Sequence, residues 1–188
     1  MTLYKGYLRT KGKVPIDKFD QMKTLKEVQD CPSYAGVLAD DMILIDIDDA
    51  EQSEILMQII EDKQIDCIVR QTTRGRHFLF RNSGVEKCGT HKKLAIGLEA
   101  DIKVGENTMQ VIKIDGEERF VEWDCDAPEP LPVWLHPVKS KIDLLNLDDG
   151  QGRNSALYSY ILCLTADFPK RRAEKLGRSS TNTFLRNR

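Results

Sequence analysis

The order of the predicted elements places the chain in the α+β class. A strand and a helix come early, several strands then follow one another across short turns, and a helix comes last. Consecutive strands joined by turns pair in antiparallel fashion, whereas alternating strands and helices would predict a parallel sheet. With 188 residues, 40% of them hydrophobic, the chain is long enough for one domain with a core and a small appendage.

Hydrophobic periodicity predicts the first elements. Residues 24–30 form a short helix, and residues 42–48 (MILIDID) form a strand rich in β-branched side chains. Asp48 or Asp49 can cap the segment 51–63, which has Glu51 or Gln52 three positions after the cap as in a capping box. This segment is a predicted helix, and its apolar face consists of Ile55, Leu56, Ile59 and Ile60.

The middle of the chain is predicted to be mainly strands. These are residues 66–71, 77–81, 98–104, 109–114 and 118–123. A turn over 72–75 joins the first two, and Asp115-Gly116 is a strong hairpin signal before the last one.

The end of the chain has a different composition. Four prolines between residues 128 and 137 interrupt the strand pattern and predict the end of a domain. Residues 154–166 then predict a helix, followed by a basic segment without clear periodicity. We therefore predict one domain over residues 1–138, and a linker with a helical tail over residues 139–188.

The charge is segregated along the sequence. The net charge is −2, from 28 basic and 30 acidic residues, and this average argues against a protein that coats nucleic acid by bulk charge. Residues 40–66, however, have Lys63 as their one basic side chain, and residues 70–93 have Glu86 as their one acidic side chain. Such blocks are either solvated faces or two sides of one site, with carboxylates for a metal and basic groups for phosphate.

The cysteines and the hydropathy predict the compartment. Five cysteines at wide spacing, without a CxxC pair, are typical of free thiols in a reducing compartment. The first residues lack the apolar segment of a secretory signal, and no run reaches the roughly 20 apolar residues that a membrane span needs. We expect a cytoplasmic protein without a membrane partner.

Asp46 and Asp48 are the first candidate site residues. Residues two apart in a strand point to the same face, so these carboxylates lie side by side, opposite an apolar face that can pack under the following helix. Adjacent like charges need a cation or a basic partner, and hard oxygen ligands suit Mg²⁺ or Mn²⁺. The alternative is a strand that runs out into a capped acidic turn.

His77 is the second candidate, in the segment TRGRHFLF. Phe78 and Phe80 share one strand face and can enter the core, whereas His77 is on the other face and is expected to point outward beside the glycine turn. Arg74 and Arg76 flank it, which favours a phosphate contact. A structural or merely exposed histidine is the alternative.

The third candidate is the strand segment EADIK. Glu99, Asp101 and Lys103 share one face, so that a carboxylate here can complete a metal site and the lysine can contact a phosphate. The alternative is a surface strand with cross-strand ion pairs. Spacing alone leaves open whether Glu99 or Asp101 is the third carboxylate.

The order and spacing of these motifs resemble a known family. An hhhDhD strand (43–48) is followed about 30 residues later by an RGxH turn (73–77), and about 25 residues beyond by a hydrophobic strand with an aspartate (97–103). This series resembles the archaeo-eukaryotic primase superfamily, in particular the phage and plasmid primase-polymerase domain. Shorter similarities near Lys13 and over 150–154 extend the resemblance to most of residues 1–165.

The resemblance implies a fold and a set of residue roles. The fold would be a primase-polymerase fold, with a lobe like the RNA recognition motif and a smaller α/β lobe, followed by a C-terminal helical segment; residues 1–138 would be the catalytic domain. The metal ligands for two Mg²⁺ or Mn²⁺ ions would be Asp46, Asp48 and Asp101, with Asp101 preferred to Glu99 because an aspartate precedes the Ile-Lys pair in related sequences. The triphosphate would be held by His77 with Arg74 or Arg76, and by Lys103.

The implied activity is template-dependent nucleotidyl transfer by a DNA primase or polymerase. Its partners would be dNTPs or NTPs, a single-stranded DNA template and a replicative helicase, in the cytoplasm of a bacterial host. The chain ends before the helicase that often follows such domains, so we expect a tail that is truncated relative to related primases. Two alternatives remain, a non-catalytic replication accessory or inhibitor that binds nucleotide or nucleic acid with the same fold, and a metal-dependent nuclease.

Overall fold

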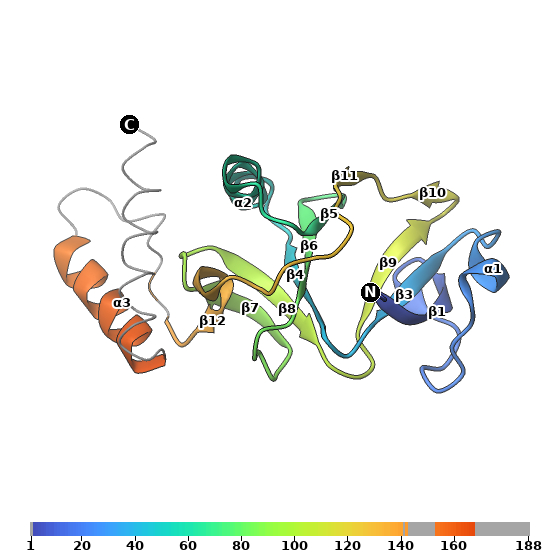
Figure 1. Cartoon of the computed structure of the whole chain (residues 1–188), viewed down its shortest axis with the longest axis horizontal. Coiled ribbons are helices and arrows are strands. Elements are labelled where there is room, and N and C mark those ends of the chain that lie inside the picture. The colour runs from blue at the N-terminus through green and yellow to red at the C-terminus, as the bar shows by residue number, and fades with distance from the viewer. Residues whose placement is uncertain (1, 141, 143–152, 168–188) are drawn as a thin grey trace. The chain divides into compact units, whose positions relative to one another are not determined.

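The computed structural model describes residues 2–140, 142 and 153–167 (Figure 1). Their elements are mostly antiparallel strands with few helices, which confirms the predicted α+β class. The chain divides into two compact units, Met1–Thr90 with Asp101–Pro130, and His91–Ala100 with Leu131–Arg188. This division differs from the predicted domain boundary after residue 138, which stays a prediction.

The first unit contains a five-stranded sheet in the order β10-β9-β3-β1-β2. Its strands are β1 (Tyr4–Lys11), β2 (Val14–Pro15), β3 (Tyr34–Leu38), β9 (Met109–Ile114) and β10 (Glu117–Glu118). The short helix α1 (Leu25–Val28) begins after Thr24, which forms the capping box with Glu27.

The hydrophobic pattern predicts β9 and α1 but neither β1 nor β3. The strand β3 is buried along its whole length, so its sequence YAGVL lacks the alternation of a half-buried strand. The register of β1 shifts between Tyr4 and Gly6, and its buried positions include Gly6 and Thr10. A period-2 hydrophobic pattern is therefore absent from both strands.

The second sheet of this unit has the order β11-β5-β6-β4-β8, all antiparallel. Its strands are β4 (Met42–Ile47), β5 (Ile68–Gln71), β6 (Arg76–Arg81), β8 (Glu99–Val104, of which 101–104 belong to this unit) and β11 (Val121–Trp123). Four of these match predicted strands. The predicted strand 118–123 is wrong, because β10 pairs with β9 whereas β11 pairs with β5 of the other sheet.

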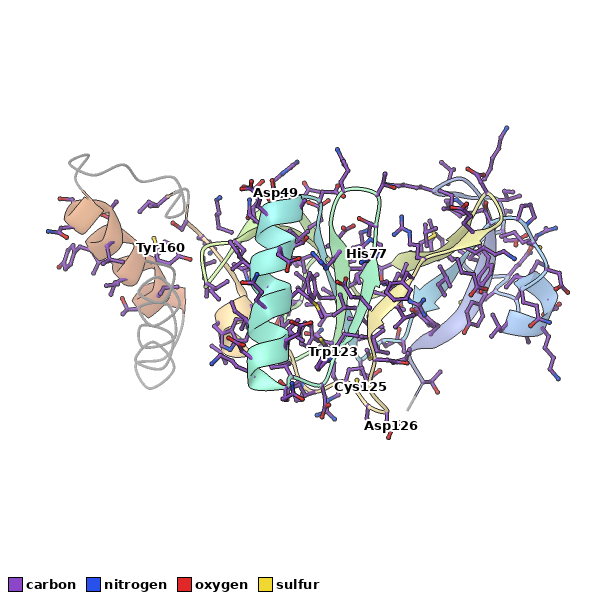
Figure 2. All side chains as sticks on the ribbon, turned by 90° about the horizontal axis from the view of Figure 1, so that it is seen from above. Asp49, His77, Trp123, Cys125, Asp126 and Tyr160 are labelled. Atoms are coloured by element: carbon purple, nitrogen blue, oxygen red, sulfur yellow. The ribbon has the colours of Figure 1, made fainter. Side chains whose placement is uncertain are left out.

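The helix α2 (Ala50–Lys63) packs on the face of β4 formed by its buried isoleucines. Asp49 is its N-cap, since the side chain accepts a hydrogen bond of 2.8 Å from the backbone N–H of Gln52. Figure 2 shows Asp49 where the helix begins and His77 in the neighbouring sheet. Of the predicted apolar face, Ile55 is only half-buried and Met57 is buried instead.

The core between the two sheets positions the candidate site. It is built from buried side chains of both sheets, Tyr4, Tyr34, Leu38 and Ile112 from one, and Met42, Leu44, Ile68 and Leu79 from the other. Because Leu44 and Asp46 are two residues apart on β4, they share a face. The candidate site residues Asp46 and His77 therefore continue the face that carries this core.

In the second unit, β12 (Pro137–Val138) pairs with β7 (Gly89–Leu94), and a 3₁₀ turn η1 spans Val133–Leu135. The predicted C-terminal helix is α3 (Arg153–Asp167), and its Tyr160 hydroxyl donates a 2.8 Å hydrogen bond to the carbonyl of Leu94. Residues 143–152 and 168–188 of the predicted linker and tail lie outside the described residues. Among the described residues, no helix is long and apolar enough to cross a membrane.

Candidate functional site

Three neighbouring strands bring Asp46, His77 and Asp101 into one row. In the register of the sheet, Asp46 of β4 is paired with His77 of β6 on one side and with Asp101 of β8 on the other. Residues directly opposite each other on adjacent strands share a face, with Cβ atoms about 4.5–5.5 Å apart. Three motifs that are far apart in the sequence are thus neighbours in the fold.

Asp46 is the centre of this row, with a side chain only 12% exposed. Its Oδ2 accepts a 2.7 Å hydrogen bond from Lys103 Nζ and lies 3.3 Å from His77 Nε2. Burial favours the neutral acid, but hydrogen bonds and charges of His77 and Lys103 outweigh it and hold the pKa of Asp46 well below its usual range. Its Oδ1 is buried and has no hydrogen-bond partner among the described residues.

His77 is buried, with 5% of its surface exposed, so the prediction of an outward-pointing side chain is wrong. The face of β6 that carries His77 meets the core between the sheets rather than solvent. Its Nδ1 lies 3.2 Å from the amide nitrogen of Gln110. Burial lowers the pKa of His77, and the positive charges of Lys103 and Arg119 lower it further, against the opposing effect of Asp46. The amide nitrogen of Gln110 facing Nδ1 matches a neutral imidazole that accepts a hydrogen bond there.

Gln110 and Arg119 are site residues that sequence analysis misses. Gln110 is fully buried on β9, and Arg119 lies half-buried between β10 and β11, with Nη1 3.2 Å from both ring nitrogens of His77. They are 33 and 42 positions from His77 in the sequence, outside every motif. A glutamine between the hydrophobic residues Met109 and Val111 is the one available signal, since a buried amide requires polar partners.

Asp48 follows the end of β4 and pairs with Arg74. The distance from Arg74 Nη2 to Asp48 Oδ2 is 2.8 Å, and both side chains are exposed, by 68% and 53%. The turn that carries Arg74 is closed by a 2.9 Å hydrogen bond from Thr72 N–H to the carbonyl of Gly75. A Cβ atom on Gly75 would lie 1.9 Å from the carbonyl oxygen of Ile47, so glycine is required for this close approach of the turn to β4.

Arg76 lies on the opposite face of β6 from His77, as strand alternation dictates. Its guanidinium binds Glu122 through two hydrogen bonds of 2.7 and 2.9 Å and lies 2.8 Å from Glu54 of α2. The structure therefore does not bring Arg76 to the row of Asp46, His77 and Asp101. Its contacts link β6, β11 and α2.

The two carboxylates that spacing left open have different surroundings. Asp101 is the direct register partner of Asp46. Glu99 belongs to the second unit, where it pairs with His91 at 2.9 Å and Lys93 at 3.3 Å. The hydrogen bond from His91 and the effects of Lys93 lower the pKa of Glu99. The geometry favours Asp101 as the third site carboxylate.

The fit of these residues to a divalent cation rests on Asp46. No group of three or more His, Cys, Asp or Glu side chains within the described residues is arranged to hold a metal ion. In the structure, Asp46 and Asp48 are instead balanced by Lys103 and Arg74. The buried, unpartnered Oδ1 of Asp46 and the adjacent Asp101 nevertheless supply hard oxygen donors of the kind that Mg²⁺ and Mn²⁺ take.

Comparison with protein-family models, with curated proteins and with solved structures finds no match to this chain. The assignment of a function therefore depends on the motifs and on the contacts described above.

Proposed function

We propose that the chain is a template-dependent nucleotidyltransferase of the primase-polymerase type. One observation carries this proposal, the register of Asp46 with both His77 and Asp101. The three sequence motifs that resemble this family are about 30 and 25 residues apart in the sequence. The sheet nevertheless places their residues Asp46, His77 and Asp101 side by side. The acidic and the basic sequence blocks thus contribute to a single site.

Carboxylates and divalent ions provide the first half of the proposed chemistry. Asp46, Asp48 and Asp101 would hold two Mg²⁺ or Mn²⁺ ions, and such ions would supply activation of the primer 3′-hydroxyl and neutralisation of the triphosphate. The unpartnered Oδ1 of Asp46 supports this role, because a buried anionic oxygen without a hydrogen bond is costly unless a ligand binds it.

Basic and polar side chains provide the second half. Lys103 and Arg74, which pair with Asp46 and Asp48 in this structure, would contact the triphosphate oxygens when a divalent ion is bound. Neutral His77 offers an N–H group at the same place. Arg119, half-buried beside His77, adds a cation whose charge interacts with those of Asp46 and Asp48. Arg76 is left out of this proposal because of its structural contacts.

The finer fold and the partners belong to the same proposal. The two antiparallel sheets of the first unit would form the primase-polymerase fold, with its lobe like the RNA recognition motif, its smaller lobe and the C-terminal helical segment. The partners are dNTPs or NTPs, a single-stranded DNA template and a replicative helicase, in the cytoplasm of a bacterial host.

Primer extension tests the proposal. The full chain is incubated with a primed DNA template, dNTPs and Mn²⁺ or Mg²⁺, and the products are resolved by length. We expect extension by the wild type and none by Asp46→Asn, because an amide cannot replace a charged metal ligand. Asp62→Asn, an equal charge change on the exposed side of α2, is the matched control and keeps full activity.

The same assay separates the alternatives. The pairing of Asp46 and Asp48 with cations of the chain itself favours a second candidate, a non-catalytic module that binds nucleotide or nucleic acid. That module would bind labelled nucleotide without extending any primer, and a nuclease would shorten the primer. Absence of extension, of de novo synthesis and of metal-dependent nucleotide binding would overturn the proposed function.

A further inference from the structure

A continuous chain of polar side chains connects the two sheets of the first unit. The Tyr4 hydroxyl on β1 donates to Oε1 of Gln110 on β9, and Nε2 of Gln110 lies 3.2 Å from Nδ1 of His77. Nε2 of His77 in turn lies 3.3 Å from Oδ2 of Asp46. All four side chains are buried or nearly so. Buried polar groups need partners of matching type, so the direction of each hydrogen bond is constrained.

Asp46 determines the direction at one end of this chain. An ionised carboxylate only accepts hydrogen bonds, so Nε2 of His77 carries a hydrogen. A neutral imidazole then has its lone pair at Nδ1, which requires a donor, and the amide nitrogen of Gln110 is that donor. The amide oxygen consequently faces Tyr4, whose hydroxyl donates to it.

Tyr4 determines the direction at the other end. Its hydroxyl donates to Oε1 of Gln110, which leaves the amide nitrogen of Gln110 to face Nδ1 of His77. Burial raises the pKa of Tyr4, and the charge of Arg70 opposes this rise. With the hydroxyl of Tyr4 donating at one end and the carboxylate of Asp46 accepting at the other, every hydrogen bond between them has the same direction.

Arg119 disfavours a second proton on the His77 ring, which would disturb this arrangement. Its Nη1 is equally far, 3.2 Å, from Nδ1 and Nε2 of His77, so it is not in line with the lone pair of either nitrogen. A cation so close to the ring disfavours the imidazolium form by charge repulsion. A neutral imidazole has two tautomers, and the contact to Gln110 selects between them.

We propose that Gln110, with Tyr4 behind it, is a positioning residue that holds His77 as the Nε2–H tautomer. The ring N–H is thereby directed to the Asp46 side, where it is the hydrogen-bond donor for the oxygens of a bound triphosphate. The identity of that ligand rests on the proposed function, whereas the tautomer does not. The role of Gln110 explains why a glutamine occupies a fully buried position of β9.

Nitrogen NMR of the full chain tests the tautomer without any nucleotide. In ¹⁵N-labelled protein near pH 7, with His77 assigned by the loss of its signals in His77→Gln, we expect a protonated Nε2 and an unprotonated Nδ1. Gln110→Glu puts an acceptor opposite Nδ1 while Asp46 keeps its acceptor opposite Nε2, so Nδ1 should become protonated as well. A wild type with the hydrogen on Nδ1, or an unchanged pattern in a folded Gln110→Glu variant, would overturn the proposal.

Nucleotide binding tests the consequence for the site. Gln110→Met keeps the length of the side chain but removes its donor, and should raise the dissociation constant for a labelled dNTP with Mn²⁺ about tenfold. Gln58→Met, on the exposed face of α2, is the control and should bind as the wild type does. Unchanged nucleotide affinity in Gln110→Met would refute the positioning role. Failure of the wild type to bind nucleotide would refute the proposed function instead, and the NMR result would still decide the tautomer.

Discussion

The two oxygens of Asp46 have unequal surroundings. Oδ2 is held by Lys103 and His77, whereas Oδ1 is buried without a hydrogen-bond partner among the described residues. The pair of aspartates in the MILIDID segment predicts a site but not this difference, because Lys103 and His77 reach Asp46 from strands that are distant in the sequence. The strand pattern does predict that Asp46 lies opposite the apolar face covered by α2, and this is confirmed.

The lowered pKa of Asp46 predicts how its contribution to stability changes with pH. A carboxylate whose folded-state pKa lies below the unfolded value stabilises the fold above the unfolded pKa of about 3.9, and this contribution is lost as the pH falls further. We expect Asp46→Asn to be less stable than the wild type at pH 7, and the difference to shrink between pH 5 and pH 2. Urea unfolding at several pH values measures it, and a difference independent of pH would contradict the account.

Arg74 and Arg76 belong to one motif, but their contacts predict opposite effects of substitution on stability and on nucleotide binding. Arg76→Gln leaves Glu122 without its bidentate partner in a largely buried position and should cost about 3 kcal/mol of unfolding free energy. Arg74→Gln breaks an exposed pair and should cost less than about 1 kcal/mol, yet weaken nucleotide binding. Chemical denaturation and nucleotide titration of both variants check this. The reverse ranking in stability would show that their contacts are wrongly assigned.

At the scale of elements, the turn over 72–75 brings the basic motif to the acidic one. It packs against the last residue of β4, so that Gly75 meets the carbonyl of Ile47 and Arg74 reaches Asp48. The glycine in the TRGRH segment predicts a turn, but the reason for glycine is a contact with another strand. Local sequence therefore predicts that the turn exists, and tertiary packing determines its residue requirement.

Gly75→Ala should destabilise the fold and disturb the site together. The added Cβ would lie 1.9 Å from a backbone oxygen, so the turn must move away from β4, at a cost of about 2 kcal/mol. Gly12→Asn is the control, because Gly12 has open space and a φ of +57°, in the left-handed region that asparagine tolerates. Thermal unfolding compares them, and equal losses in the two variants would refute the packing argument.

The strands show which elements can be predicted from a sequence. Richness in β-branched residues predicts β4, although it is buried on both faces. Alternation predicts β8, whose buried and half-buried positions alternate along the strand. Wholly buried β3 has no such alternation. The chain passes from one sheet to the other between β10 and β11, and Arg119 lies in that connection. To predict this passage, one must know which strands pair. The place of Arg119 beside His77 follows from the sheet topology and not from a local motif.

At the scale of the whole molecule, the net charge of −2 is the sum of opposed blocks. Within the first unit, the acidic block contributes Asp46 and Asp48, and the basic block contributes Arg74 and His77. Their ion pair and hydrogen bonds bring the two blocks together in one place. A chain that is nearly neutral overall therefore has a strongly charged local site, as a metal-dependent polymerase requires.

The most direct test of the central claim is the position of a bound metal ion. A crystal of the full chain with Mn²⁺ and a non-hydrolysable nucleotide, measured for anomalous scattering, locates the ion without reference to activity. We expect a peak at the carboxylates of Asp46 and Asp101, with Lys103 turned toward the phosphates. A peak elsewhere, for instance at the cavity lined by Asp66, Asp124 and Asp126, or no peak at saturating Mn²⁺, would contradict the account.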